Sequence, residues 1–297
     1  MDYFLSLLIT GLILGIIYAL MALGLTLIFS ILNVINFAHG EFYMLGGYAS
    51  YLILGVFTGI HPLLIVPISG LIVAGLGILF EIFFLRPMHE EQIARPAEYA
   101  VLVTFGLSFF LQNLALAQFG PYPHAPRPFF EGSVDLGVVN VSADRLTASV
   151  LSLLLLGALL LIINKTWLGK ALRAVSQDKQ AAAVVGINPN AMNTVAFALG
   201  VGLAAVAGAL LAPVFSITPD VGAVPAIRSY IIIVLGGMGS LPGSILGGVV
   251  IGLVESFGAG YFPDPSRALN YKTVFGLLIF ALVLLLRPRG FFGRKEV

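Results

Sequence analysis

Four strongly polar side chains lie between two long apolar runs, in the segment "NVINFAHGEF". They are Asn33, Asn36, His39 and Glu41, and the last two flank Gly40. At membrane depth, non-helical backbone is tolerated only where protein or water surrounds it, and transporters place substrate paths in such segments. This interpretation is favoured for the two asparagines. For Glu41, a helix cap on the positive end of the following helix dipole is favoured instead.

Other residue patterns exclude most enzyme classes. The chain has no G-x-x-x-x-G-K-[ST] phosphate loop, no H-E-x-x-H and no G-x-S-x-G. It has no cysteine, so a thiolate nucleophile or a cysteine metal site is excluded. His39 and Glu41 are too close in sequence to be read as a catalytic dyad. We therefore predict no catalytic residue, no metal site and no cofactor, and the net charge of +1 does not indicate nucleic acid.

The composition sets the solvent of the protein. Hydrophobic residues make up 59% of the 297 residues and charged residues 10%, whereas soluble domains carry about 25% charged residues. The prediction is an all-α, polytopic protein whose main partner is the lipid bilayer. The first apolar segment lacks a basic start and a small-residue cleavage site, so we expect a retained span rather than a cleaved leader.

A membrane-spanning helix needs about 20 mainly apolar residues. The clear candidates are 4–29, 61–85, 99–119, 147–163, 191–216 and 271–287. A shorter candidate, 41–57, follows the polar segment. The apolar stretch 225–258 is interrupted by "GGMGSLPG" at 236–243.

Basic residues predict the orientation. Ten of the 15 Lys and Arg residues fall in three segments; these are Arg86 and Arg95, Lys165, Lys170, Arg173 and Lys179, and Arg287, Arg289, Arg294 and Lys295. The positive-inside rule places these segments in the cytoplasm. The 225–258 stretch must then cross twice, as 225–239 and 241–258. The result is about nine passes with the N-terminus outside and the C-terminus cytoplasmic, or about eight if 225–239 only dips into the membrane.

This topology predicts an inverted repeat within a single transmembrane domain, 1–297. The first half, 4–119, and the second half, 191–287, would each make about four passes, in opposite directions. Residues 147–190 would connect them as a linker span and a cytoplasmic loop. Glycines of the second half recur at helical spacing and predict close helix packing. They are Gly236, Gly239, Gly243, Gly247, Gly248 and Gly252.

Two further carboxylates lie within apolar runs, and one loop carries apolar side chains. Pairing or snorkelling towards the membrane surface accounts for Glu81, near Arg86, and for Glu255, near the predicted outer turn. The outer loop 120–146 is rich in proline, and we read it either as a passive connector or as a docking surface for an external partner. Its Phe129 and Phe130 are expected to be exposed and to need cover.

The cytoplasmic loop 167–191 carries the most specific pattern. Ser176 or Asp178 is placed to cap a short helix over 179–185, which Gly186 ends and Pro189 prevents from continuing. A short helix with small apolar faces suits a groove in another protein. The candidate contact residues are Gln180, Ala181, Ala182, Ala183 and Gly186.

The sequence "QAAAVVG" in this loop resembles the cytoplasmic coupling loop of ABC importer permeases, with Gln180 replacing a glutamate. "GIIYALMALGLTLIF", "NVINFAHGEFYMLGGY" and "VLGGMGSLPGSILGG" resemble the H-type permease of branched-chain amino-acid importers, in order and over nearly the whole chain. The resemblance implies a translocation path formed with a second, M-type permease. It also implies two cytoplasmic ATPase subunits, an external substrate-binding protein, leucine, isoleucine, valine or related ligands, and location in the cell (inner or plasma) membrane.

Three alternatives stay open from the sequence. A permease for urea or short amides shares the fold and many of the motifs. A stand-alone facilitator or ion-coupled carrier is disfavoured by the long cytoplasmic loop and by the absence of an obvious paired ionic site. A structural membrane subunit without transport activity is the third.

Overall fold

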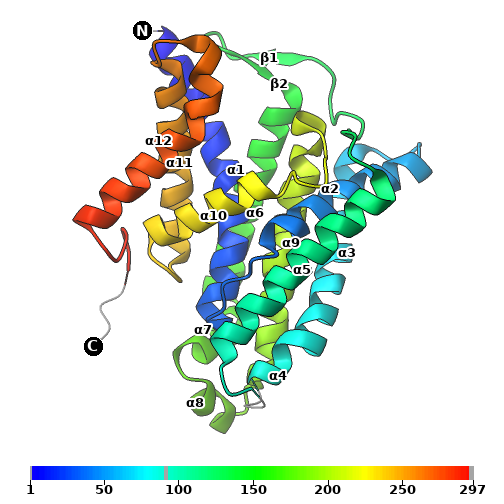
Figure 1. Ribbon diagram of the computed structural model, residues 1–297, viewed down its shortest axis with the longest axis vertical. Helices are drawn as coiled ribbons and strands as arrows, with labels where there is room; N and C mark the ends of the chain where they lie inside the picture. Colours follow the sequence, from blue (N-terminus) through cyan, green and yellow to red (C-terminus); the bar gives the residue numbers. More distant parts are fainter. Residues whose placement is uncertain (1, 90–92, 294–297) are drawn as a thin grey trace.

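The computed structural model describes residues 2–89 and 93–293, and helices dominate it (Figure 1). The elements in chain order are α1 (Asp2–Leu32), α2 (His39–Val56), α3 (Pro62–Phe80), the π-helical turn η1 (Glu81–Leu85), α4 (Arg86–His89), α5 (Pro96–Phe119), β1 (Ser133–Asp135), β2 (Asn140–Ser142), α6 (Ala143–Lys165), α7 (Trp167–Gln177), α8 (Lys179–Val184), α9 (Pro189–Phe215), α10 (Ala223–Gly236), α11 (Leu241–Gly260) and α12 (Pro265–Leu286). β1 and β2 form one short antiparallel hairpin. Of the predicted basic tail, Arg294 and Lys295 lie outside the described residues.

Six helices in the described residues are long and apolar enough to cross a membrane. They are Asp2–Leu32, Pro62–Met88, Pro96–Phe119, Ala143–Lys165, Pro189–Phe215 and Leu241–Gly260. The prediction of a largely helical, multi-pass membrane protein is therefore confirmed. Two shorter apolar helices, Ala223–Gly236 and Tyr271–Leu286, fall on two of the three remaining predicted spans, 225–239 and 271–287. The third, 41–57, folds as the helix α2 but is not among the six.

The two longest helices, α1 and α9, form the centre of the protein. In each, 78% of the most apolar stretch is buried inside the protein, against 22% for α5. α1 packs along α11 and α9, while α9 also packs against α2 and α3 (Figure 1). Apolar side chains on the outer helices, such as Leu102 on α5 and Leu285 on α12, are exposed, as expected where lipid is the solvent.

Paired glycines form close contacts between helices from the first and second halves of the chain, α1 with α9 and the start of α2 with the start of α10. A Cβ on Gly24 of α1 would overlap the carbonyl oxygen of Gly200 on α9, and a Cβ on Gly200 would overlap that of Gly24. Gly40, in the first turn of α2, and Gly222, just before α10, exclude side chains on each other in the same reciprocal way. Both contacts therefore need glycine on both sides, because backbone meets backbone there.

The chain breaks in the same manner after each central helix. α1 ends at Leu32, and the next residue, Asn33, has a φ of 57°. α9 ends at Phe215, and the next residue, Ser216, has a φ of 56°. These are the only described non-glycine residues with a positive φ. Each is followed by an irregular segment, 33–38 or 216–222, and then by a shorter helix, α2 or α10.

The predicted packing glycines divide between three contacts. Gly248 and Gly252 of α11 face α1 at Ala19 and Gly15, where an added Cβ would clash with backbone. Gly236 and Gly243 exclude side chains on each other across the turn between α10 and α11, and Gly247 faces Ile232 of α10. Gly239 lies in that turn with a φ of 83°, a conformation that favours glycine.

Loops of different character gather at the two ends of the molecule. The N-terminus, the hairpin β1–β2 and the turn between α11 and α12 lie at one end in Figure 1, and α4, α7 and α8 lie at the other. In the loop before β1, His124 pairs through its backbone with Ile217, in the break after α9. Phe129 is 5% exposed and its amide donates to Asp144, so the expectation that it is exposed was wrong; Phe130 is 48% exposed.

Candidate functional site

The break after α1 holds the polar residues that the sequence singled out. Asn33 is exposed and ends the helix in a left-handed conformation that asparagine tolerates well. Asn36 and His39 are fully buried. The Asn36 side-chain oxygen accepts from the Ala38 amide at 3.1 Å, and His39 Nε2 donates to the Met21 carbonyl at 3.1 Å. One polar atom of Asn36 and one of His39 are thus used to satisfy backbone groups near the break.

The same break leaves three buried polar atoms without a hydrogen-bond partner among the described residues. They are Asn36 Nδ2, His39 Nδ1 and one carboxylate oxygen of Glu41. The other Glu41 oxygen accepts from the Ser108 hydroxyl on α5 at 2.9 Å. Glu41 lies in the first turn of α2, as the helix-cap interpretation predicted, and makes this second contact as well. The structure therefore brings Asn36, His39 and Glu41 close together, and leaves Asn33 apart at the surface.

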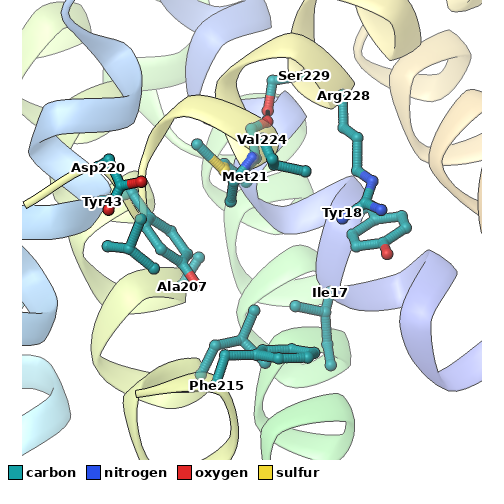
Figure 2. Close-up of a pocket in the computed structure, with 13 residues that line it drawn as sticks. Ile17, Tyr18, Met21, Tyr43, Ala207, Phe215, Asp220, Val224, Arg228 and Ser229 are labelled. Atoms are coloured by element: carbon teal, nitrogen blue, oxygen red, sulfur yellow. Dashed lines mark hydrogen bonds between the residues drawn. The ribbon is translucent and has the colours of Figure 1, made fainter. Parts of the chain in front are cut away.

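A cavity of about 290 Å³ lies at the other break, between α1, α9 and α10 (Figure 2). None of the four polar residues at the first break lines it. Most of its wall is apolar, including Ile17, Met21, Leu211, Phe215 and Val224. Its polar lining consists of Tyr18, Tyr43, Asp220, Arg228 and Ser229.

Arg228 is fixed at one side of this cavity. Its Nε donates to a Glu255 carboxylate oxygen at 2.8 Å, and its guanidinium lies 4.7 Å from the centre of the Tyr18 ring. The Tyr18 hydroxyl donates to the other Glu255 oxygen at 3.0 Å, and Lys272 Nζ lies 3.8 Å from that oxygen. Four helices therefore contribute to one buried ionic cluster, which we name the Glu255 cluster: Tyr18, Arg228, Glu255 and Lys272.

The two carboxylates in apolar runs are buried and paired rather than snorkelled. Glu255 is 1% exposed and Glu81 is fully buried. Glu81 accepts from the Thr194 hydroxyl at 2.6 Å and lies 3.8 Å from Arg86. Pairing was one of the two predicted explanations and is correct, whereas snorkelling was wrong for both. Sequence reasoning did not select Arg228 as a site residue; the available signal was a single arginine within the apolar sequence of α10.

The predicted coupling loop folds as α7 and α8. Asp178 caps α8, accepting from the amides of Gln180 at 2.8 Å and Ala181 at 2.9 Å. Gly186 follows with a φ of 84°, as expected for a helix-ending glycine. Burial lowers the pKa of Lys179 below its usual value. Lys179 itself is partly buried at the start of α8.

The two faces of α8 differ in exposure. Ala182 is 3% exposed and faces the interior of the protein, so it is not available to a partner. Gln180, Ala181 and Ala183 are exposed, and beside them Val184 is 88% and Val185 74% exposed. Val184 and Val185 therefore expose apolar side chains at the end of α8, outside the helices that are long enough to span a membrane.

Comparison with known proteins identifies the family. The family described as "Branched-chain amino acid transport system / permease component" matches residues 7–285. This chain belongs to that permease family. The BraD permease protein of Pseudomonas aeruginosa, from a high-affinity branched-chain amino acid transport system, is 36% identical over 99% of this chain and 97% of its own length. The LivH permease protein of Escherichia coli K12 is 33% identical over 99% of this chain and 97% of its own length.

A second permease component is also similar. The LivM permease protein of Escherichia coli K12 is 27% identical over 79% of this chain and 60% of its own length. One bacterium therefore holds two relatives of this permease family, named as separate components. No solved structure matches the chain. The relatives are named as transport permeases rather than as enzymes, in agreement with the absence of enzyme motifs from the sequence.

Proposed function

We propose that the chain is the membrane-spanning permease subunit of an ATP-driven importer for branched-chain or related amino acids, and that it forms the translocation path with a second, M-type permease. The observation that carries the proposal is the cavity between α1, α9 and α10, together with family membership. Its wall is mostly aliphatic and aromatic, with one arginine. This lining suits an amino acid with an apolar side chain better than urea or a short amide, which would leave the apolar wall unfilled.

Two ATPase subunits are proposed to bind the end of the molecule that carries α4, α7 and α8. The exposed valines at the end of α8, Val184 and Val185, supply the apolar contact, with Gln180, Ala181 and Ala183 beside them. Gly186 ends the element and Ala182 anchors it to the chain. An external binding protein would then dock at the opposite end, over the loop between α5 and α6.

The topology is proposed to be an inverted repeat within one permease domain, with the C-terminus cytoplasmic. The matching left-handed residues after α1 and α9, and the reciprocal pair Gly40–Gly222 in the segments that follow them, support this, because contacts on a two-fold axis join equivalent residues. α10 has 14 residues and a length of about 21 Å, below the ~30 Å hydrocarbon thickness. It therefore enters the membrane as a short broken helix.

The polar residues at the first break are proposed to frame the path rather than to bind substrate. Asn36, His39 and Glu41 would hold the start of α2 in place beside α10, since the Tyr230 hydroxyl on α10 donates to the Asn36 carbonyl at 2.8 Å. Asn33 would contribute the bend that separates this segment from α1.

Reconstitution tests the function. The chain is purified with the second permease, the ATPases and the binding protein, and placed in liposomes. We expect ATP-dependent uptake of leucine, isoleucine or valine, and no uptake when the ATPases are omitted. Uptake of urea but not of leucine, or leucine uptake without ATPases, would reject the proposal.

Cysteine labelling tests the orientation, because the chain has no cysteine of its own. Cysteines at exposed Glu98 and Glu131 should react with an impermeant thiol reagent from opposite sides of the membrane. Reaction of both from the same side contradicts the topology.

A further inference from the structure

The cavity between α1, α9 and α10 has the charge pattern of a site for a carboxylate. Among the described residues, Glu255 is the only acceptor for the guanidinium of Arg228, and it takes only Nε. A guanidinium has five N–H donors, so the two terminal nitrogens retain donors for a ligand. Arg228 lines the cavity directly (Figure 2).

The Glu255 cluster holds an excess of positive charge, while Asp220 adds a negative charge at the opposite side of the cavity. Glu255 supplies one negative charge against Arg228 and Lys272. A neighbouring cavity, lined by Glu255, Lys272 and Phe215, adds Arg145, whose guanidinium lies 5.7 Å from the Phe215 ring centre. Buried charges need partners, and an excess cation beside an empty space is stabilised by an anion that enters it.

The guanidinium is also held in place for recognition. The Tyr18 ring lies against it, and Glu255 fixes Nε, so its terminal nitrogens have little freedom. A planar guanidinium binds a carboxylate through two parallel hydrogen bonds, which is more selective than binding by a lysine. Asp220 lies across the cavity from Arg228 in Figure 2, and its negative charge would repel a carboxylate from that side.

We propose that this cavity binds the translocated α-amino acid, with its carboxylate on the terminal nitrogens of Arg228 and its apolar side chain against Ile17, Leu211 and Phe215. Tyr18 and Glu255 act as positioning residues for the guanidinium. The proposal rests on the proposed transport function and adds to it a binding site within this chain. Ligands that lack a carboxylate, such as urea or an amino-acid amide, would be bound poorly.

The test uses photo-leucine, a diazirine analogue that keeps the carboxylate and ammonium groups of leucine. The complex of both permeases and the ATPases is labelled in nanodiscs at millimolar probe. The binding protein is left out, so that competition between ligands reports on the permease cavity and not on the binding protein. Mass spectrometry of the cross-linked peptides should locate the label on residues that line the cavity, in α1, α9, α10 and segment 216–222 or on Tyr43 of α2. Excess leucine should remove the label, and excess leucinamide should not.

Variants separate the carboxylate contact from general damage. Arg228→Gln should lower labelling about 10- to 100-fold, the range expected for loss of a charged hydrogen-bond pair. The double variant Arg228→Gln/Glu255→Gln removes the ion pair as a unit, and it should lose labelling equally if the single variant does not fold. The matched control is Arg86→Gln, which breaks another arginine–glutamate pair away from the cavity and should keep full labelling.

Several outcomes overturn the site. Wild-type labelling away from the residues that line the cavity, equal competition by leucinamide, or full labelling of a folded Arg228 variant would each do so. Uptake by the same complex in liposomes, with the binding protein added, is measured in parallel. If ATP-driven leucine uptake is present but the labelling result is negative, the site is wrong and the transport function stands. If uptake is absent, the transport function itself fails.

Discussion

The breaks after α1 and α9 begin with the same backbone conformation but differ in what surrounds them. After α1, the chain buries Asn36, His39 and Glu41 within protein, and their hydrogen bonds go mainly to backbone and to Ser108. After α9, the chain opens onto a cavity whose charged residues, Asp220 and Arg228, face space. The two breaks therefore differ in role. The break after α1 holds α2 in place, and the break after α9 leaves space for a ligand.

The largest difference between the two breaks is expected when a carboxylate is neutralised at each of them. Glu255→Gln leaves Arg228 and Lys272 without their counter-charge, and we expect a loss of about 3–5 kcal/mol in stability, since breaking a buried ion pair strands the remaining charge. Glu41→Gln, at the first break, should cost about 1 kcal/mol or less, because the amide oxygen still accepts from Ser108. Chemical denaturation in detergent compares the two. Equal losses would remove the distinction between the breaks.

The contact between the two breaks gives the next largest effect. Gly222→Leu would drive a side chain into the backbone at Gly40, and we expect a loss of about 1–3 kcal/mol with lower yield of the assembled complex. Gly55→Leu is the control, because a Cβ at Gly55 of α2 meets nothing within 4 Å. Thermal unfolding and size-exclusion chromatography measure both. If the two variants behave alike, close approach at Gly222 is not required.

Truncating the buried amide at the first break should affect transport more than folding. Asn36→Leu removes Nδ2, a buried donor without a described partner, but it also removes the oxygen that accepts from Ala38. These changes nearly offset each other, so stability should change by about 1 kcal/mol or less. Uptake should fall several-fold if this segment frames the path. Unchanged uptake for both Asn36→Leu and His39→Leu would show that these residues cap the helix and do not contribute to the path.

The exposed valines at the end of α8 can be tested as the proposed contact with the ATPases. Val184→Asp places a charge on an 88% exposed side chain, so folding should be unaffected. It should weaken co-purification of the ATPases, since burying an unpaired charge at the contact is unfavourable. Val134→Asp, on the exposed hairpin at the other end, is the matched control. Full ATPase binding and full uptake by Val184→Asp would exclude this surface as the contact.

The smallest effect compares the two left-handed residues themselves. Ser216→Gly should stabilise the protein by up to about 1 kcal/mol, because glycine has no steric penalty at a φ of 56°. Asn33→Gly should change stability less, since asparagine already tolerates this region. Differential scanning calorimetry of both variants measures the difference. A larger gain at Asn33 than at Ser216 would contradict the conformational explanation.

The features that sequence could predict are local ones. The polar break before α2 follows from residue types within ten positions, and the short helix capped by Asp178 and ended by Gly186 follows from capping rules. Arg228 was not selected because the other members of the Glu255 cluster, Tyr18, Glu255 and Lys272, come from three other helices and are brought together only by packing. Burial was predicted less well than secondary structure: Phe129 was expected outside and is inside, and Ala182 faces the chain rather than a partner.

One helix joins the two functional regions. α9 starts just after the α8 element and ends at Phe215 on the cavity wall, and its 27 residues give it a length of about 40 Å. A continuous helix of this kind behaves as a lever, so a tilt imposed at the end next to α8 displaces the other end. Thermodynamic linkage then runs in both directions. If nucleotide-bound ATPases change the affinity of the cavity for its ligand, an occupied cavity must change the affinity of the permease for nucleotide-bound ATPases by the same factor.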